Sequence, residues 1–244
     1  MSNYGKLCTM IYDLDKPYAA KEETEIYSRI IKSKNDKILE PMCGSGRFYV
    51  PFLEDGYDIT GFDLSEDMLE ACKRKCFELG IKPNVFKADM VHYQCSKKYK
   101  YIFIPVGSIS LLISENDLYQ SLFNMYNCME SNGIFVFSYL GPESKSENIN
   151  EWREVQNYAI DDKKIVCKQK SKYINESDIL NIKLLYELIQ NEVVIENEYQ
   201  NFPVKLFTEK YLKKILGTIG FSEIEPIKSS NSENDYNILK CVKL

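Results

Sequence analysis

The sequence predicts an α/β fold in which a doubly wound, parallel sheet carries an inserted antiparallel cap. Short apolar runs alternate with helical segments between residues 37 and 140, which indicates βαβ units covered on both faces. Residues 141–205 lose this alternation and place apolar side chains at every second position, which indicates antiparallel strands. Because the chain shows no internal repeat and no linker, we expect residues 1–244 to form a single domain with 141–205 as its cap.

The elements of the sheet follow from local patterns. Short apolar runs predict five strands, at residues 37–40, 57–63, 83–87, 101–105 and 134–140. Apolar stripes and capping residues predict helices at residues 18–33, 47–54, 65–80 and from Ser114 to near Gly133. The third helix is expected to begin at Ser65, because Glu66 and Asp67 place the favoured negative charge in its first turn.

The second half of the chain predicts the cap and the end of the sheet. Residues 164–173, 180–188 and 193–199 indicate perhaps three cap strands, with a turn at Asn191-Glu192. Thr208 is expected to cap a helix that ends at Gly220. Residues 222–227 and 236–244 then fit a hairpin at the sheet edge.

Composition limits the possible partners. The net charge of −5 and the lack of a clustered basic run argue against nucleic acid. No apolar stretch reaches the roughly 20 residues of a membrane span, and residues 1–10 do not resemble a signal peptide, so we expect a soluble cytoplasmic protein. Cys72 and Cys76 stand four residues apart on an expected helix, but the chain holds one histidine and no C-x-x-C pair, so we expect no metal.

The turn after the first strand carries the clearest functional signal. Gly44 and Gly46 allow a ligand to approach the backbone, and the following helix points N–H groups at it. The phosphate-loop pattern is absent, and the dinucleotide pattern G-x-G-x-x-G fails because Tyr49 stands at the third glycine position. A ligand bearing a carboxylate therefore fits this turn.

Two acidic residues follow the next two strands. Asp63 ends the second strand, where a carboxylate can accept hydrogen bonds from both hydroxyls of a ribose. Asp89 follows the third strand and can accept from the exocyclic amine of adenine, with Met90, Leu64 and Met68 as apolar surfaces for the ring. Taken singly, each aspartate is as readily a helix-capping or surface residue; their order favours a nucleoside site.

These segments resemble a known family. Ile38-Leu-Glu-Pro-Met-Cys-Gly-Ser-Gly46, Gly61-Phe-Asp-Leu-Ser65 with Met68, and Ala88-Asp-Met90 are similar to the first three motifs of class I S-adenosylmethionine-dependent methyltransferases. The resemblance covers residues 20–140 and the closing helix and hairpin. It implies a Rossmann-like sheet of seven strands with the last antiparallel, S-adenosylmethionine as cofactor and S-adenosylhomocysteine as product.

The resemblance also implies roles for residues at the motif positions. The methionine part would contact Glu40, Cys43, Gly44 and Gly46. The ribose would contact Asp63, and the adenine Asp89 and Met90, beside Leu64 and Met68. Pro105 would line the methyl-transfer face, and Tyr18, like Tyr12-Asp13, belongs to a segment similar to one that folds over the cofactor; fraying of this terminus is the alternative. One residue departs from the family, which usually has glycine where this chain has Met42.

The reaction and its acceptor are less closely defined. Methyl transfer from a sulfonium is an in-line displacement that positioning can largely catalyse, so a general base is not required. His92 is the one candidate base, although a loop histidine without a role fits its place better. Ser108, Tyr139 and Arg153 are candidate acceptor contacts, under a cap that either roofs the site or forms a structural cover or dimer interface. We expect a small-molecule acceptor and a monomer or homodimer.

Two other functions remain as alternatives. A nucleic-acid or protein methyltransferase would keep the cofactor site. Amino-methylating nucleic-acid enzymes of this fold have an Asn/Asp-Pro-Pro-aromatic tetrad after the fourth strand, where this chain reads Ile104-Pro-Val-Gly107. A non-catalytic cofactor-binding module is the third possibility, and the intact acceptors at Asp63 and Asp89 weigh against it.

Overall fold

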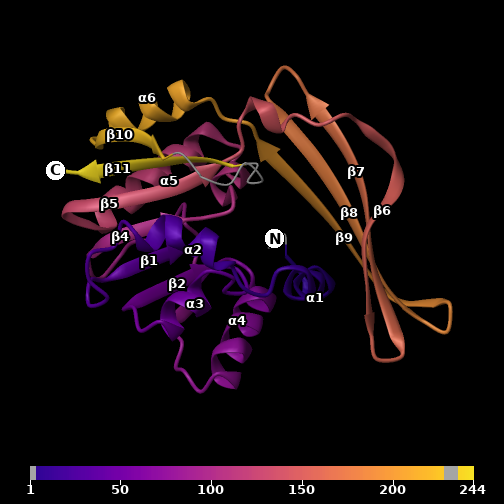
Figure 1. Cartoon of the computed structure of the whole chain (residues 1–244). Helices are drawn as coiled ribbons and strands as arrows, with labels where there is room; N and C mark the ends of the chain where they lie inside the picture. Colours follow the sequence, from indigo (N-terminus) through magenta and orange to yellow (C-terminus); the bar gives the residue numbers. More distant parts are fainter. Residues whose placement is uncertain (1–3, 228–235) are drawn as a thin grey trace.

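The computed structural model of the chain describes residues 4–227 and 236–244. Its larger sheet has seven strands in the order β10-β11-β5-β4-β1-β2-β3 (Figure 1). These are β1 (Ile38–Pro41), β2 (Ile59–Asp63), β3 (Val85–Lys87), β4 (Tyr99–Ile104), β5 (Met129–Tyr139), β10 (Ser222–Ile227) and β11 (Asn237–Lys243). Strands β1 to β5 pair in parallel, whereas β11 runs antiparallel to both of its neighbours. The predicted Rossmann-like sheet with an antiparallel last strand is confirmed.

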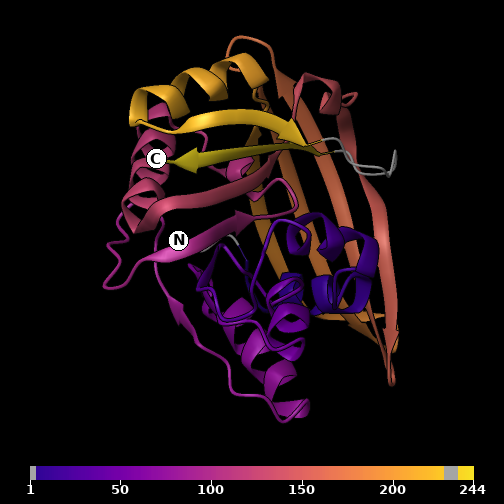
Figure 2. The same cartoon turned by 60° about the vertical axis from the view of Figure 1, so that its left-hand side comes forward.

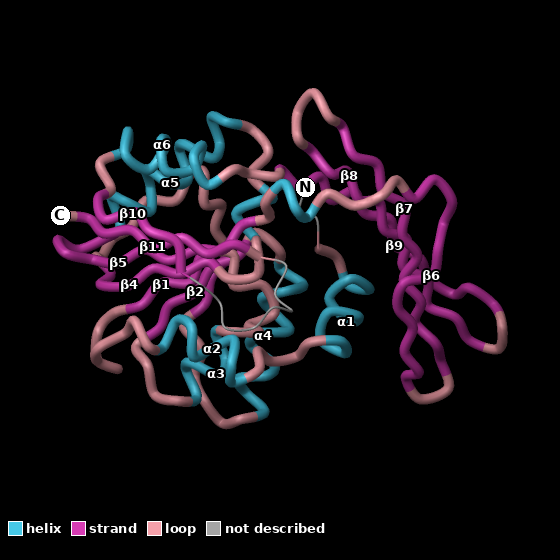
Figure 3. Tube along the Cα trace, turned by 45° about the horizontal axis from the view of Figure 1, so that its top comes forward, coloured by secondary structure: helices cyan, strands magenta, loops and turns pink. Residues whose placement is uncertain are grey.

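Helices cover both faces of this sheet (Figure 3). One face carries α2 (Lys21–Ser28), α3 (Tyr49–Glu54) and α4 (Glu66–Glu78), and the other carries α5 (Glu115–Cys128) and α6 (Glu209–Ile219). Alternation along β1 separates the two layers. Ile38 is buried in the core below α3 and α4, whereas Leu39 is buried in the core below α5 and α6.

Two predicted caps begin helices where the sequence places them. The hydroxyl of Ser65 accepts the N–H of Met68 at 3.2 Å at the start of α4. Thr208 caps α6 in the same way, and that helix ends at Gly220, whose φ of 115° is left-handed. The end of α5 is a correction, because the helix stops at Cys128 and β5 begins at Met129, several residues before the expected start at 134.

The inserted cap is an antiparallel sheet, as predicted, but it has four strands rather than three. They are β6 (Ile149–Ile160), β7 (Lys163–Ile174), β8 (Ile179–Gln190) and β9 (Val193–Lys205). The predicted turn between the last two holds, since Asn191 and Glu192 both have positive φ, as a tight hairpin requires. Strand β6 escaped the sequence reading because it is an edge strand whose side chains are mostly exposed, which leaves little apolar alternation.

A further helix precedes the predicted ones. The expected helix at 18–33 is reduced to α2, and α1 (Lys6–Asp15) lies before it, between α4 and the cap (Figures 1 and 2). Leu7 and Ile11 of α1 are buried against Met68 of α4 and Ile165 of the cap. The cap follows the carboxyl end of β5, so α1 and the cap both lie at the edge of the sheet where the parallel strands end. Among the described residues, no helix combines the length and apolar character of a membrane span.

Candidate functional site

A cavity of about 210 Å³ opens at the carboxyl ends of the central strands. It is lined by predicted residues from the glycine loop, the ends of β2 and β3, and the segment after β4. These are Gly44, Asp63, Leu64, Met68, Asp89, Met90 and Ser108. Residues separated by up to 64 positions in the chain thus surround one space, because parallel strands end at a common edge.

Asp63 connects two walls of the cavity. Its Oδ2 accepts the N–H of Gly44 at 2.9 Å, and its Oδ1 accepts the N–H of Ser65 at 2.8 Å. Burial raises the pKa of Asp63, and the backbone N–H groups of Ser65, Gly44 and Leu64 oppose that shift. Each oxygen keeps a further lone pair, so the carboxylate is oriented and can still accept hydrogen bonds from a ligand.

The glycine loop has left-handed backbone at three positions. Met42, Gly44 and Gly46 have φ values of 57°, 53° and 84°. A Cβ on Gly46 would lie 2.6 Å from the Sγ of Cys72, so only glycine fits there. Met42 adopts the left-handed conformation that suits the family's usual glycine, at a cost of roughly 1–2 kcal/mol, and its side chain lines the cavity. The departure in sequence therefore leaves a left-handed loop.

Glu40 is a buried carboxylate beside this loop. It is 2% exposed, and its Oε2 has no hydrogen-bond partner among the described residues. Burial raises its pKa well above the ordinary range, and the charge of Asp63 raises it further. An orphaned, buried acceptor next to a glycine loop fits the ammonium group of a methionine moiety.

Arg47, at the end of the glycine loop, connects this loop to two helices. The guanidinium of Arg47 donates to both carboxylate oxygens of Glu23 on α2, at 2.6 and 2.8 Å. It also hydrogen-bonds Tyr12, whose pKa is raised mainly by burial and lowered by Arg47. Tyr12 in turn lines the cavity, so α2, the glycine loop and α1 are joined at this point.

The part of the cavity predicted to bind adenine has one acidic residue, Asp89, among apolar side chains. The Oδ1 of Asp89 accepts the N–H of Val91 at 2.9 Å, while Met90 is buried beside Phe62 in the core. His92 donates its backbone N–H to the carbonyl of Asp89, but its side chain is exposed and does not line the cavity.

The segment after β4 is strained. Val106 and Gly107 have successive φ values of 58° and 68°, and a β-branched residue seldom adopts this conformation. The bend places Ser108 on the cavity, where its hydroxyl donates to the carbonyl of Pro105 at 3.1 Å. Backbone strain of this kind commonly collects at functional sites.

Several predicted residues lie away from the cavity wall. Glu40, Cys43, Gly46 and Pro105 are buried behind it. Tyr18 is 43% exposed beside the ammonium group of Lys75, and Arg153 is exposed on β6, opposite Gln169. Tyr139 is buried in the core under α5 and α6 rather than at the site.

Helix α1 and the residue Tyr4 before it supply cavity contacts that the sequence did not predict. Tyr4 and Tyr12 both line the space, and the ring of Tyr4 packs edge-on against Phe202 of the cap at 4.8 Å between centroids. Tyr12 stood out in the sequence only by its resemblance to a covering segment. Leu7 and Ile11, four residues apart, were the available signal for a helix here.

The comparisons with known proteins agree with this geometry. Residues 38–133 match the family model described as a methyltransferase domain. This segment of the chain is thus similar to a methyltransferase domain. The match spans the strands and loops that carry Glu40, Gly44, Asp63, Asp89 and Ser108.

Similar proteins and solved structures extend the comparison. A candidate methyltransferase of Geobacillus sp. (strain WCH70) is 26% identical over 101 residues, which cover 41% of this chain and 41% of that protein. The aligned part is thus less than half the length of that curated relative. An S-adenosylmethionine-dependent methyltransferase from Clostridium acetobutylicum ATCC 824 has a TM-score of 0.77 at 17% identity, covering 96% of each chain. The sugar N-methyltransferase KedS8 from Streptoalloteichus sp. ATCC 53650 has a TM-score of 0.79 at 18% identity, covering 96% of this chain and 92% of that one. The fold, cap included, is that of class I S-adenosylmethionine-dependent methyltransferases.

Proposed function

We propose that the protein is an S-adenosylmethionine-dependent methyltransferase that transfers a methyl group to a small-molecule acceptor by in-line displacement. The proposal depends mainly on the placement of Asp63. Its carboxylate is held by the N–H groups of Gly44 and Ser65 in the wall of a cavity that Asp89 also lines. S-adenosylmethionine, when bound, supplies a methyl group on a sulfonium, with S-adenosylhomocysteine as the product.

The binding roles follow the placement of the side chains. Asp63 is oriented to accept the ribose hydroxyls, and Glu40 offers an unpaired acceptor to the methionine ammonium group. Asp89 accepts from the adenine amine, between the apolar side chains of Leu64 and Met90.

Five further predicted residues are also part of the proposal. Met68 adds an apolar contact for the adenine, and Gly44 brings backbone close to the methionine part. Cys43, Gly46 and Pro105 act from behind as packing that shapes the loop and the methyl-transfer face.

Catalysis rests on positioning and on exclusion of water. Tyr12 of α1, Tyr4 just before that helix, and Leu111 and Leu112 after β4 line the cavity with aromatic and apolar side chains. His92 is exposed and outside this wall, so we assign no general base. An acceptor with a free amine or thiolate needs none.

The acceptor is proposed to be small because Tyr4 and Tyr12 line the cavity, and α1 is held in place against the cap. Neighbours in fold include proteins described as a sugar N-methyltransferase and an amino pentose methyltransferase, which supports an amine acceptor on a small molecule. Ser108 is the proposed acceptor contact. The exposure of Arg153 and the burial of Tyr139 weigh against contact from either. We further propose that residues 1–244 act as a single domain, in the cytoplasm, as a monomer or homodimer.

Calorimetric titration with S-adenosylmethionine and S-adenosylhomocysteine tests the cofactor assignment. Replacing Asp63 by alanine should weaken binding by at least tenfold, since a hydrogen bond to a charged group contributes about 1.5–3 kcal/mol. Asp67→Ala, on the exposed first turn of α4, is the matched control and should bind like wild type. Wild type that binds neither compound would refute the proposal, whereas binding that survives Asp63→Ala would refute only the role of Asp63.

The acceptor class needs a second assay. Transfer of labelled methyl from S-adenosylmethionine should be measured with pools of amino sugars and other small amines, and separately with RNA, DNA and a protein extract. Uptake into the small-molecule pools is the expected result. Uptake into nucleic acid or protein alone, or into none of them despite cofactor binding, would favour the two competing functions.

A further inference from the structure

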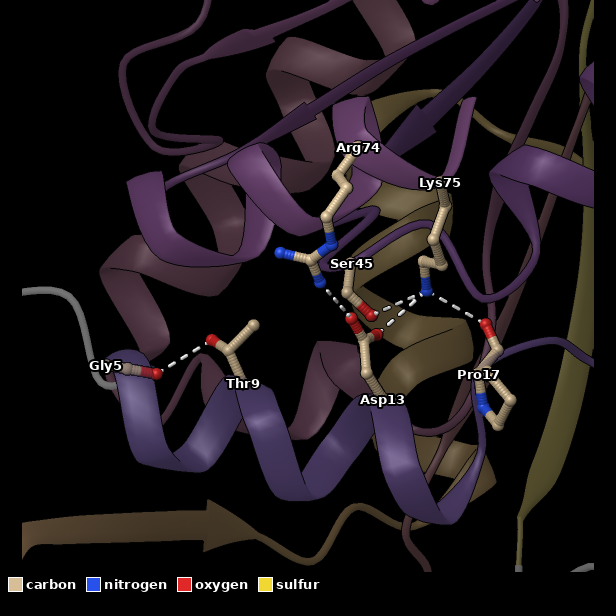
Figure 4. A network of polar contacts seen from close by, with 7 residues as sticks. All are labelled: Gly5, Thr9, Asp13, Pro17, Ser45, Arg74 and Lys75. Atoms are coloured by element: carbon tan, nitrogen blue, oxygen red, sulfur yellow. Dashed lines mark hydrogen bonds and ion pairs between the residues drawn. The ribbon is translucent and has the colours of Figure 1, made fainter. Parts of the chain in front are cut away.

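Lys75 is a buried cation that the cofactor site described above does not use. It lies on α4 with its side chain 7% exposed. Its ammonium group donates to the Oδ1 of Asp13 at 2.8 Å, to the carbonyl of Pro17 at 2.9 Å and to the Oγ of Ser45 at 3.3 Å (Figure 4). All three donor positions of the ammonium group are thus occupied by oxygen.

The three acceptors belong to different parts of the cofactor site. Asp13 is in α1, which we call the lid helix, and Pro17 is in the connection that follows it. Ser45 is fully buried between Gly44 and Gly46 in the glycine loop. Figure 4 shows the ammonium group of Lys75 bonded to Asp13 and Ser45, which lie close together, and to Pro17 on its other side.

Two of these acceptors, Asp13 and Ser45, stand next to a residue of the cavity wall. Asp13 directly follows Tyr12, which lines the cavity. Ser45 directly follows Gly44, whose N–H holds Asp63. A displacement of either segment relative to Lys75 therefore moves a residue that faces the cavity.

The ion pair at the centre of this cluster is largely withdrawn from water. Asp13 is 15% exposed, and its other oxygen accepts from Arg74 at 3.2 Å. Arg74 is itself 60% exposed, so it provides a weaker, solvated partner. Loss of the lysine would leave Asp13 half-paired and Ser45 without its donor, which is costly for buried groups.

We infer that Lys75 is a positioning residue that fixes the lid helix against the glycine loop and thereby sets the affinity for the cofactor. This inference rests on the proposed function. Lys75 does not line the cavity itself, and it acts through its hydrogen bonds to Asp13 and Ser45.

The test compares Lys75→Met with Lys73→Met in the full chain. Methionine keeps most of the buried chain length and removes the charge, and Lys73 is the matched control because it is 44% exposed and pairs only with Glu70. Calorimetry with S-adenosylhomocysteine should give about tenfold weaker binding for Lys75→Met and no change for Lys73→Met. Hydrogen exchange over residues 6–15 should be faster in Lys75→Met, since the lid helix loses its anchor. With an acceptor in hand, KM for S-adenosylmethionine should rise more than kcat falls.

A purely structural role would give a different result. Lower thermal stability with unchanged S-adenosylhomocysteine affinity and unchanged exchange in the lid helix would overturn the inference. Absence of binding by wild type would instead refute the proposed function, and the two failures are therefore distinct. If Lys75→Met does not fold, Asp13→Asn and Ser45→Ala keep the lysine and remove one acceptor each. Both should weaken binding, and unchanged affinity in both would overturn the inference.

Discussion

Replacing Glu40 by glutamine should make the ligand-free protein more stable and its cofactor binding weaker. The carboxylate is 2% exposed, one of its oxygens has no partner among the described residues, and Asp63 adds like charge. Glutamine has nearly the same shape without the charge. The substitution therefore removes a buried carboxyl group whose charged form only a bound cation would compensate.

The sign of the pH dependence follows from the direction of the shift. Burial, then Asp63, raises the pKa of Glu40, so the folded state holds its proton more tightly than the unfolded chain does. Folding stability is then lost as the pH rises from the ordinary glutamate value of about 4.3 toward the raised one. The stabilisation by Glu40→Gln should accordingly be largest near neutral pH and vanish in acid.

The magnitude comes from the cost of an unsatisfied buried group, roughly 1–3 kcal/mol. For a chain of this size each kcal/mol raises Tm by about 2–4 °C. Loss of one charged hydrogen bond to the ligand should weaken S-adenosylmethionine binding by tenfold or more, from about 1.5–3 kcal/mol. Thermal unfolding across acidic to neutral pH and calorimetry at neutral pH measure the two effects. A lower Tm at neutral pH, or an unchanged affinity, would refute this account of Glu40.

Two further substitutions test the loop and the lid helix. In chemical unfolding, Gly46→Ala should destabilise the protein more than Gly56→Ala does. Both glycines have φ of 84°, so the backbone cost of each substitution is about 1 kcal/mol, but only at Gly46 would the new Cβ lie 2.6 Å from Cys72. Equal losses of stability would mean that close packing at Gly46 is unimportant. Glu198→Gln should speed hydrogen exchange over residues 6–15 and lower the free energy of unfolding by about 1 kcal/mol. The reason is that the carboxylate of Glu198 accepts hydrogen bonds from the N–H groups of Leu7 and Cys8 at the start of the lid helix. Exchange at the wild-type rate would contradict this prediction.

Much of the sheet and its motif positions could be predicted because the signals are local. Ser65 and Thr208 begin their helices by bonds within three residues, and alternation assigns Ile38 and Leu39 to opposite layers. Gly44, Asp63 and Asp89 meet because parallel strands end at one edge, which is a property of the topology rather than of the side chains.

The parts that escaped prediction depend on distant partners. The lid helix has buried residues because α4 and the cap, both later in the chain, pack against them. The same alternation that sorts β1 turns Tyr139 into the core with Phe137, a choice that its position at the end of β5 conceals. The positions of Tyr4 and Lys75 depend on this packing, and no local sequence pattern around either residue predicts a functional site.

The contact between the lid helix and Glu198 has a consequence for how the protein folds. The N–H of Leu7 meets its acceptor 191 residues further along the chain, a contact of high order whose loop must close late. During synthesis the glycine loop and the first strands leave the ribosome well before β9 exists. The first helix of the chain is therefore among the last to settle, and the cavity stays open on that side until the cap is complete.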